Sequence, residues 1–223
     1  MILLDEAARH LKASLKDMDT VVLTPRLSQV YAGINGHADL LVHKLDDSTL
    51  AVAAECTDFF KNLGLHYNVM PIEGIASPYP GHVQLNIAVF GKWVIHNMKV
   101  TPEPVRAFYE RQGYHFIHVA QGYTKCNLVV GRRSLITSDV GIYRTLKDIA
   151  PILLVESEHV ALKGFNYGFL GGASGLINDT LVFAGSLERH PSYARIVKFL
   201  DRQGESWTQL QGPLVDVGTL IQI

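Results

Sequence analysis

The residue whose type and neighbours most favour covalent chemistry is Cys126, which stands between Lys125 and Asn127. The thiolate is the nucleophilic form of cysteine, and a nearby ammonium group lowers the pKa of a thiol. Adjacent residues of a strand face opposite sides, however, so Lys125 and Cys126 need not meet. A buried, inert thiol is the more common fate of a cysteine, and both interpretations stay open. We interpret Cys56, which precedes a predicted helix, as a packing residue.

His82 and Asn86 lie at the start of another predicted strand, directly after the proline-rich segment 77–81. A histidine at a strand start is more often a hydrogen-bonded structural residue than a ligand contact. As a catalytic base, His82 would have to lie within hydrogen-bond reach of Cys126, about 3 to 4 Å. The sequence therefore offers these two residues as a candidate nucleophile and base, provided that the fold brings them together.

A third group of candidates lies near the C-terminal end, at Gly171, Gly172, Ser174 and Asp216. Backbone N–H groups of a glycine pair and a serine hydroxyl could hold an anionic or carbonyl ligand, as anion-binding nests do. The same glycines could instead serve only to let two strands approach closely. Asp216 is the only carboxylate at the start of the last predicted strand, where it could bind a cationic group or cap a turn.

The spacing of the histidines favours no metal site. His37 and His43 lie six residues apart, His115 and His118 lie three apart, and neither H-x-x-x-H nor C-x-x-C occurs. The glycine-rich phosphate-binding patterns of nucleotide cofactors are absent as well. From the sequence we therefore predict neither a metal nor a cofactor.

The composition excludes several broad classes of protein. The chain has 223 residues, of which 48% are hydrophobic, and its 20 basic and 21 acidic residues balance to a net charge of −1. A nucleic-acid-binding protein usually shows a basic excess, so we expect no nucleic-acid partner. Two cysteines make no disulfide framework, and neither a signal peptide nor a membrane span is evident. We therefore expect a cytoplasmic protein; its oligomeric state is not predicted.

The order of the predicted elements repeats along the chain. Five helices are predicted at 5–17, 57–63, 101–112, 141–149 and 191–203, and an apolar strand follows each one at 20–24, 65–72, 114–119, 151–155 and 206–210. Hairpins with Gly, Asn or Asp in their turns lie between these pairs, at 39–54, 83–96, 127–137 and 176–183. The order strand–turn–strand–helix–strand thus recurs four times, with a period of roughly 40 to 50 residues.

A fifth unit is split between the two ends of the chain. The chain ends in an apolar strand at 215–223 and begins with a helix and a strand, which together lack only a clear second hairpin strand. Pairing the two ends would close a ring and protect sheet edges. We therefore predict a single α/β domain over residues 1–223, a five-unit α/β propeller, in preference to an ordinary α/β sandwich.

This architecture resembles the pentein superfamily of guanidino-group-modifying enzymes, which includes deiminases, dimethylarginine dimethylaminohydrolase, amidinotransferases and a non-catalytic ribosome anti-association factor. The segment 169–185 resembles the superfamily's glycine pair followed by a short hairpin. The segments 121–127 and 164–175 are similar to an uncharacterised bacterial branch of the superfamily. The resemblance implies a ring of five units around a central axis, bordered by the first strand of each unit.

The catalytic pattern of the deiminases is not present. The resemblance implies a catalytic cysteine near the C-terminal end, but the matching segment 214–223 contains none. The position that resembles their catalytic histidine is Tyr123. Without the thiolate, the covalent amidine intermediate cannot form at that place.

We therefore expect a catalytically divergent pentein-fold protein that binds a small zwitterionic or amino-acid-like metabolite in the axial channel. The residues expected to line the channel are His82, Asn86, Lys125, Cys126, Asn127, Gly171, Gly172, Ser174 and Asp216. One alternative is an amidine or amide hydrolase that acts on C–N bonds and uses Cys126. A second alternative is a non-catalytic scaffold like the ribosomal factor.

Overall fold

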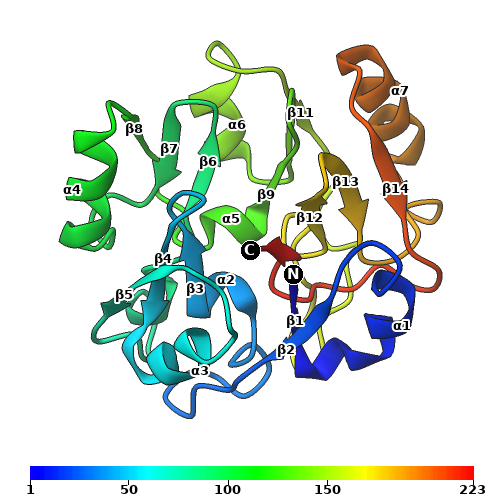
Figure 1. The fold of residues 1–223 in the computed structure, drawn as a ribbon. Helices are drawn as coiled ribbons and strands as arrows, with labels where there is room; N and C mark the ends of the chain where they lie inside the picture. Colours follow the sequence, from blue (N-terminus) through cyan, green and yellow to red (C-terminus); the bar gives the residue numbers. More distant parts are fainter.

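The computed structural model describes residues 1–223 as a ring of five three-stranded sheets, each with helical segments on its outer side (Figure 1). In every sheet the middle strand pairs antiparallel with the inner strand and parallel with the outer one. Written from inner to outer strand, the sheets are β15 (Ile221–Gln222), β1 (Ile2–Asp5) and β2 (Val21–Thr24); β3 (Val42–Lys44), β4 (Thr49–Ala53) and β5 (Asn68–Ile72); β6 (Ala88–Phe90), β7 (Trp93–His96) and β8 (His115–His118); β9 (Leu128–Val130), β10 (Leu135–Thr137) and β11 (Ile152–Leu154); and β12 (Ser174–Ile177), β13 (Thr180–Phe183) and β14 (Trp207–Gln209).

In each unit a helical segment connects the middle strand to the outer strand, as a parallel crossover requires. These segments are η1 (Glu6–Leu11) with α1 (Lys12–Leu15), η2 (Ala54–Cys56) with α3 (Thr57–Lys61), α4 (Glu103–Arg111), α6 (Val140–Leu146) and α7 (Tyr193–Gln203). Three further helical turns precede inner strands, namely α2 (Ala38–Leu41), η3 (Gly81–Val83) and α5 (Thr124–Asn127).

The fifth sheet shows why the sequence forms this unit. Asn178 and Asp179 take positive φ angles of 47° and 62°, and Ile177 pairs with Thr180 across them, which gives a two-residue hairpin turn. The helix α7 buries Ile196 and Leu200 on one face, and Gly204 ends it in the left-handed conformation.

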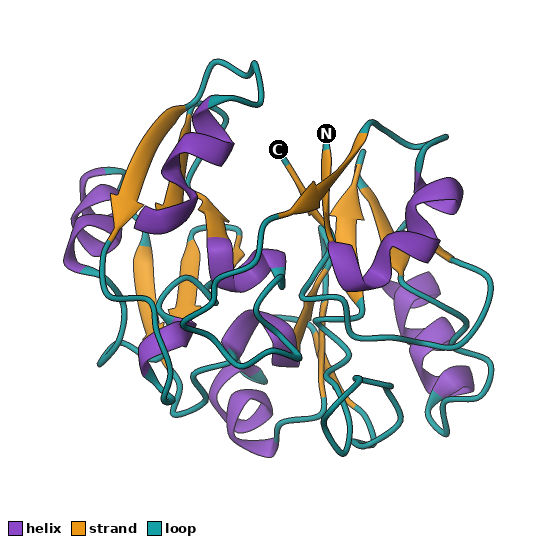
Figure 2. Ribbon diagram, turned by 90° about the horizontal axis from the view of Figure 1, so that it is seen from below, coloured by secondary structure: helices purple, strands orange, loops and turns teal.

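The predicted five-unit ring is confirmed, and the structure supplies the strand that the sequence left unassigned. The short apolar run at the N-terminal end is β1, whose four residues are all buried. It pairs antiparallel with β15, so that Ile2 faces Gln222 and Leu3 faces Ile221. Figures 1 and 2 show the two ends of the chain side by side near the centre of the ring, on the same face. The split unit is therefore complete.

Several inner strands are shorter than the sequence predicts. The expected strand at 39–45 begins with α2, and the segments before β6 and β9 contain the helical turns η3 and α5. The expected final strand at 215–223 is restricted to β15, because Gly218 and Thr219 take φ angles of 69° and 65° that interrupt the extended backbone. The Asp216 carboxylate stabilises this turn by accepting the Gly218 N–H group at 3.0 Å.

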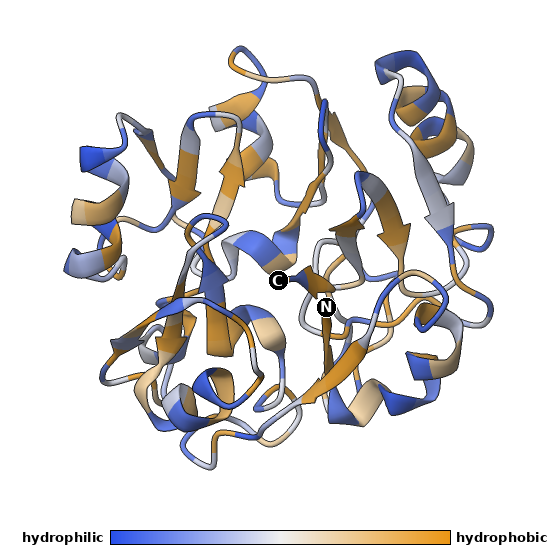
Figure 3. Cartoon of the chain, in the orientation of Figure 1, coloured by the Kyte–Doolittle hydropathy of each residue, from blue (hydrophilic) through white to orange (hydrophobic).

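Hydrophobic side chains fill the layers between the sheets and the outer helices, while one polar element lies near the axis. The middle strands are mostly hydrophobic, and the outer helices α4 and α7 alternate between hydrophilic and hydrophobic turns (Figure 3). The short helix α5, near the centre of the ring, is among the most hydrophilic segments there (Figures 1 and 3). None of the helices is long and apolar enough to cross a membrane.

Candidate functional site

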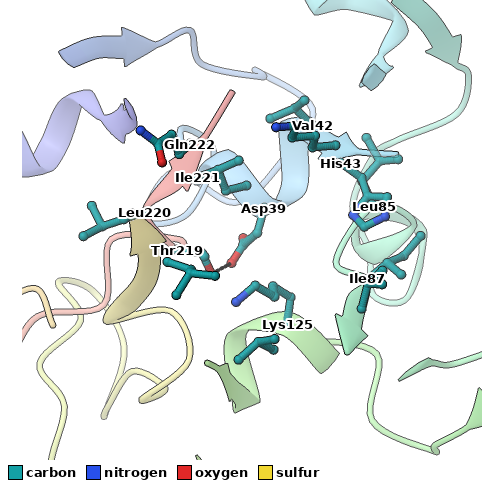
Figure 4. A pocket seen from close by; sticks show the side chains of 14 residues that line it. Asp39, Val42, His43, Leu85, Ile87, Lys125, Thr219, Leu220, Ile221 and Gln222 are labelled. Carbon is teal, nitrogen blue, oxygen red and sulfur yellow. Dashed lines mark hydrogen bonds between the residues drawn. The ribbon is translucent and has the colours of Figure 1, made fainter. Parts of the chain in front are cut away.

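Two cavities lie at opposite ends of the ring's axis. The first, which we call the Lys125 cavity, has a volume of about 280 Å³ and is lined mainly by inner strands and residues next to them (Figure 4). The second, the Cys126 cavity, has a volume of about 260 Å³ and is lined mainly by residues that precede the inner strands. The Lys125 cavity is lined by Asp39, Val42, His43, Lys44, Leu85, Ile87, Val89, Lys125, Val130, Leu176, Thr219, Leu220, Ile221 and Gln222. The Cys126 cavity is lined by Ile34, His37, Tyr123, Cys126, Leu162, Phe165, Asn166, Tyr167, Phe169 and Asp216.

The Asp39 carboxylate lies between the two cavities and links residues from three units. Its Oδ2 atom accepts the Thr219 hydroxyl at 2.7 Å and the Cys126 thiol at 3.0 Å. Its Oδ1 atom is buried and has no hydrogen-bond partner. Asp39 itself is 1% exposed, so the free oxygen represents unused binding capacity in the interior.

The contacts of Cys126 favour the protonated thiol. Burial raises its pKa well above the ordinary value, and the Asp39 and Asp216 carboxylates raise it further. Asn86 opposes this shift by donating its side-chain N–H to Sγ at 3.1 Å, and its Oδ1 atom accepts the Cys126 backbone N–H at 3.1 Å. Asn86 therefore fixes the position of the thiol, while the balance of charges does not prepare a thiolate.

Lys125 faces the other cavity from the neighbouring position on α5. Its ammonium group extends into the Lys125 cavity toward Asp39 and Thr219 (Figure 4). Desolvation lowers its pKa to about 8, although the charges of Asp39 and Cys126 act in the opposite direction. No carboxylate lies within ion-pair distance of it. Lys125 and Cys126 thus line different cavities, as their adjacent positions in the sequence suggested.

The Cys126 cavity combines aromatic walls with a polar floor. Tyr123 lies near Phe169, with their ring centroids 6.0 Å apart, and Tyr167 contacts Phe169 at 6.1 Å. At the floor, the two ring nitrogens of His37 lie 3.7 Å from Asp5 and 3.9 Å from Asp216.

Asp216 is held by backbone donors at this floor. Its Oδ2 atom accepts the Phe169 N–H at 2.8 Å. Burial raises the pKa of this carboxyl, which the charge of His37 and the backbone hydrogen bonds partly oppose. The floor therefore gathers acidic and imidazole groups in a small, water-poor space.

The glycine pair meets a packing requirement. A side chain on Gly171 would overlap the backbone carbonyl of Lys125, and one on Gly172 would overlap the Asp216 carboxylate. The Gly172 N–H donates to the Cys126 carbonyl at 2.8 Å, and Ser174 donates its hydroxyl to the Gly171 carbonyl at 3.0 Å. Close approach of the chain at the axis, rather than a free nest of N–H groups, accounts for these residues.

The structure places His82 and Asn127 outside both cavities. His82 forms a 2.5 Å hydrogen bond from Nε2 to the Tyr123 hydroxyl, and its Nδ1 atom is buried without a partner. No hydrogen bond joins His82 to Cys126. Asn127 donates its side-chain N–H to the Tyr123 carbonyl at 3.0 Å and so supports the helical turn.

Sequence reasoning missed three residues that complete the axial cluster, namely His37, Asp39 and Thr219. Asp39 interrupts the apolar run at 38–42, and this buried acid was the one available indication. His37 was considered only for its spacing from other histidines, although its chemical partners are distant in the sequence.

Comparison with known proteins identifies the fold. The chain is similar to crystal structures of dimethylarginine dimethylaminohydrolase, among them the enzyme from Pseudomonas aeruginosa as a cysteine-to-serine mutant complexed with citrulline. That match has a TM-score of 0.59 and 11% identity and covers 92% of this chain and 80% of the other. A histidine-to-glycine variant of the enzyme, an adduct with S-methyl-L-thiocitrulline, matches with a TM-score of 0.60 and 12% identity over 94% and 91% of the two chains. An adduct with 4-chloro-2-hydroxymethylpyridine matches with a TM-score of 0.58 and 11% identity over the same fractions.

These similarities establish the pentein fold, in agreement with the resemblance seen in the sequence. A comparison with curated proteins found no match. Residues 3–221 match the model of a family of unknown function (DUF6873). The chain therefore belongs to this family, DUF6873, within the pentein superfamily.

Proposed function

We propose that the chain binds a small zwitterionic metabolite, an amino acid with an aliphatic side chain, in the Lys125 cavity. The observation that carries the proposal is the presence of two opposite charges that line one cavity and are not paired with each other. Lys125 has no acidic partner, and Asp39 Oδ1 has no donor. A ligand with one carboxylate and one ammonium group would satisfy both.

The remaining walls indicate the kind of side chain. Eight of the fourteen lining residues are hydrophobic, and aliphatic side chains such as Leu85, Ile87 and Leu176 dominate. A cavity of about 280 Å³ lies just below the ~300–1,000 Å³ range typical of ligand pockets. These dimensions favour a single small metabolite, with its charged end at Lys125 and Asp39 and its apolar end against the strands.

The known relatives of this fold add support for the class of ligand. Two of the dimethylarginine dimethylaminohydrolase structures contain citrulline or S-methyl-L-thiocitrulline, both of which are amino acids. The hydrolase alternative receives less support, because Cys126 donates its proton to Asp39 and no histidine contacts its sulfur. We therefore place non-covalent binding first.

Isothermal titration calorimetry with L-leucine, L-valine and L-methionine tests the proposal, with EDTA present throughout. The matched probes are 4-methylpentanoate, which lacks the ammonium group of leucine, and 3-methylbutylamine, which lacks the carboxylate. Each should bind at least about 10-fold more weakly than L-leucine, because a hydrogen bond to a charged group contributes about 1.5–3 kcal/mol.

Replacement of the two charged residues completes the test. Lys125→Met and Asp39→Asn should each weaken binding of L-leucine by about 10- to 100-fold. Lys44→Met is the matched control, because Lys44 lines the same cavity but already pairs with Asp47 at 2.9 Å. Equal affinity for leucine and its two single-charge analogues, or unchanged affinity in Lys125→Met, would refute the proposal.

A further inference from the structure

We propose that His37, Asp39 and Cys126 form a zinc site on the axis, with an open coordination position that faces the Cys126 cavity. One ligand atom from each side chain lies within 4.8 Å of the other two, and all three residues are buried. An imidazole nitrogen, a carboxylate oxygen and a thiolate sulfur are the three donor types that Zn²⁺ takes in proteins. The site lies outside the Lys125–ligand contacts of the proposed function but shares Asp39 with them.

The spacing of the three donors requires only a small adjustment. Tetrahedral zinc has bonds of about 2.0–2.3 Å, so its ligand atoms lie about 3.3–3.8 Å apart. Cys126 Sγ and Asp39 Oδ2 are now 3.0 Å apart through their hydrogen bond, and the full set spans at most 4.8 Å. Rotation of side chains by less than about 1 Å would bring the three atoms to metal-ligand spacing.

The unpartnered oxygen of Asp39 is an independent indication of a ligand. A buried carboxylate oxygen without a donor is costly, and such groups are rare unless they serve a ligand or a reaction. Asp39 Oδ1 is such an atom, in a residue that is 1% exposed. Asp5 and Asp216 flank the His37 ring at 3.7 and 3.9 Å, so the cluster is rich in negative charge. A divalent cation would neutralise this charge.

The groups around the three ligands resemble the outer contacts of metal sites. Metal-bound histidines usually donate their second ring N–H to a carboxylate, and ligating carboxylates accept further hydrogen bonds. Asp216 or Asp5 could orient His37 in this way, and Thr219 already donates to Asp39 at 2.7 Å. Asn86 donates to the Cys126 sulfur at 3.1 Å.

Binding and its balance can be stated atom by atom. The Cys126 thiol loses its proton to the solvent, a Zn–S bond forms, and the Asp39 oxygen that accepted the thiol proton becomes free to coordinate. His37 coordinates through one neutral ring nitrogen. Because His37 and Cys126 both line the Cys126 cavity, a water molecule or a small anion can take the fourth position.

A titration of the untagged chain with metal alone tests the proposal without the amino-acid ligand. After dialysis against EDTA and removal of the chelator, Zn²⁺ is titrated in competition with a chromophoric chelator, and Co²⁺ serves as a spectroscopic substitute. We expect one equivalent of Zn²⁺ and, with Co²⁺, a thiolate-to-cobalt charge-transfer band with tetrahedral d–d bands. Cys126→Ser and His37→Gln should each weaken Zn²⁺ binding by at least about 100-fold and abolish or shift the cobalt bands.

Cys56→Ser is the matched control, since Cys56 is a buried thiol packed in the hydrophobic core away from this cluster. It should bind Zn²⁺ as the wild type does. Absence of the thiolate-to-cobalt band in the wild type, or unchanged Zn²⁺ affinity in Cys126→Ser, would overturn the proposal even if one variant folds poorly. The amino-acid titrations contain EDTA and the metal titrations contain no amino acid, so either proposal can fail alone.

Discussion

Acid should destabilise this fold through two buried neutral histidines. His43 Nε2 lies 2.7 Å from the Tyr109 hydroxyl, and burial, assisted by the charges of His96 and Lys125, lowers its pKa to about 3. His96 contacts Thr101 at 2.8 Å and the Val83 carbonyl at 3.1 Å, and burial lowers its pKa to about 4. In the unfolded chain both histidines would titrate near pH 6.5.

The sign of the effect follows from these differences. As the pH falls below about 6.5, the unfolded state binds protons that the folded state does not, so the free energy of unfolding decreases. The loss continues until the pH reaches the folded pKa values of about 3 and 4. Between pH 7 and pH 5, each histidine should cost about 2 kcal/mol and the pair about 4 kcal/mol. That loss is a large fraction of the ~5–15 kcal/mol by which domains are stable.

Urea unfolding of the wild type and of His43→Gln at pH 7, 6 and 5 measures this contribution. Glutamine cannot titrate, and its side-chain oxygen can still accept the hydroxyl proton of Tyr109. The variant should be less stable at pH 7, but it should lose about 2 kcal/mol less than the wild type between pH 7 and pH 5. His10→Gln is the control, because His10 is exposed, and it should follow the wild type. Identical losses for His43→Gln and the wild type would refute the assignment of a buried neutral histidine.

Two further substitutions test the packing around the axis and the support of a hairpin. Gly172→Ala would place a methyl group on the Asp216 carboxylate, so it should lower the free energy of unfolding by about 1–3 kcal/mol in urea titrations; an unchanged value would show that the axis can widen. Glu205→Ala removes a buried carboxylate that accepts the N–H groups of Arg132 and Arg133 and the hydroxyl of Ser134, at 3.2, 2.6 and 3.0 Å. It should cost about 2–4 kcal/mol and expose the β9–β10 turn to faster amide exchange, whereas equal exchange in variant and wild type would contradict this role.

The repeated unit could be read from the sequence because its determinants are local. Glycines after helices, turn residues in hairpins and apolar strands recur within each segment of about 40 to 50 residues. The strand β1 escaped notice because all four of its residues are buried, so the run shows no alternation that would separate a strand from any other apolar segment. The helical turns α2 and α5 are too short to produce a helical period.

The axial cluster was only half visible for a different reason. Cys126, Lys125 and Asp216 stand out by residue type, but their partners are distant along the chain. The thiol of Cys126 meets Asp39 across 87 positions, and Thr219 meets Asp39 across 180. Neither motif spacing nor periodicity over a single element can reveal a contact that only closure of the ring creates.

The repeat itself nevertheless contains the information that brings these residues together. Asn86, Cys126, Gly172 and Thr219 each stand two positions before an inner strand, and Asp39 stands three positions before one. In a ring of equivalent units, equivalent positions lie at the same height around the axis, so four of these five must converge there with the fifth close by. The hydrogen bonds of Asp39 to Cys126 and Thr219, and of Asn86 to Cys126, are the contacts that this equivalence requires. Glycine at the fifth position leaves room for the other side chains. Aligning the units of a ring by the starts of their inner strands therefore identifies axial residues that no linear motif connects.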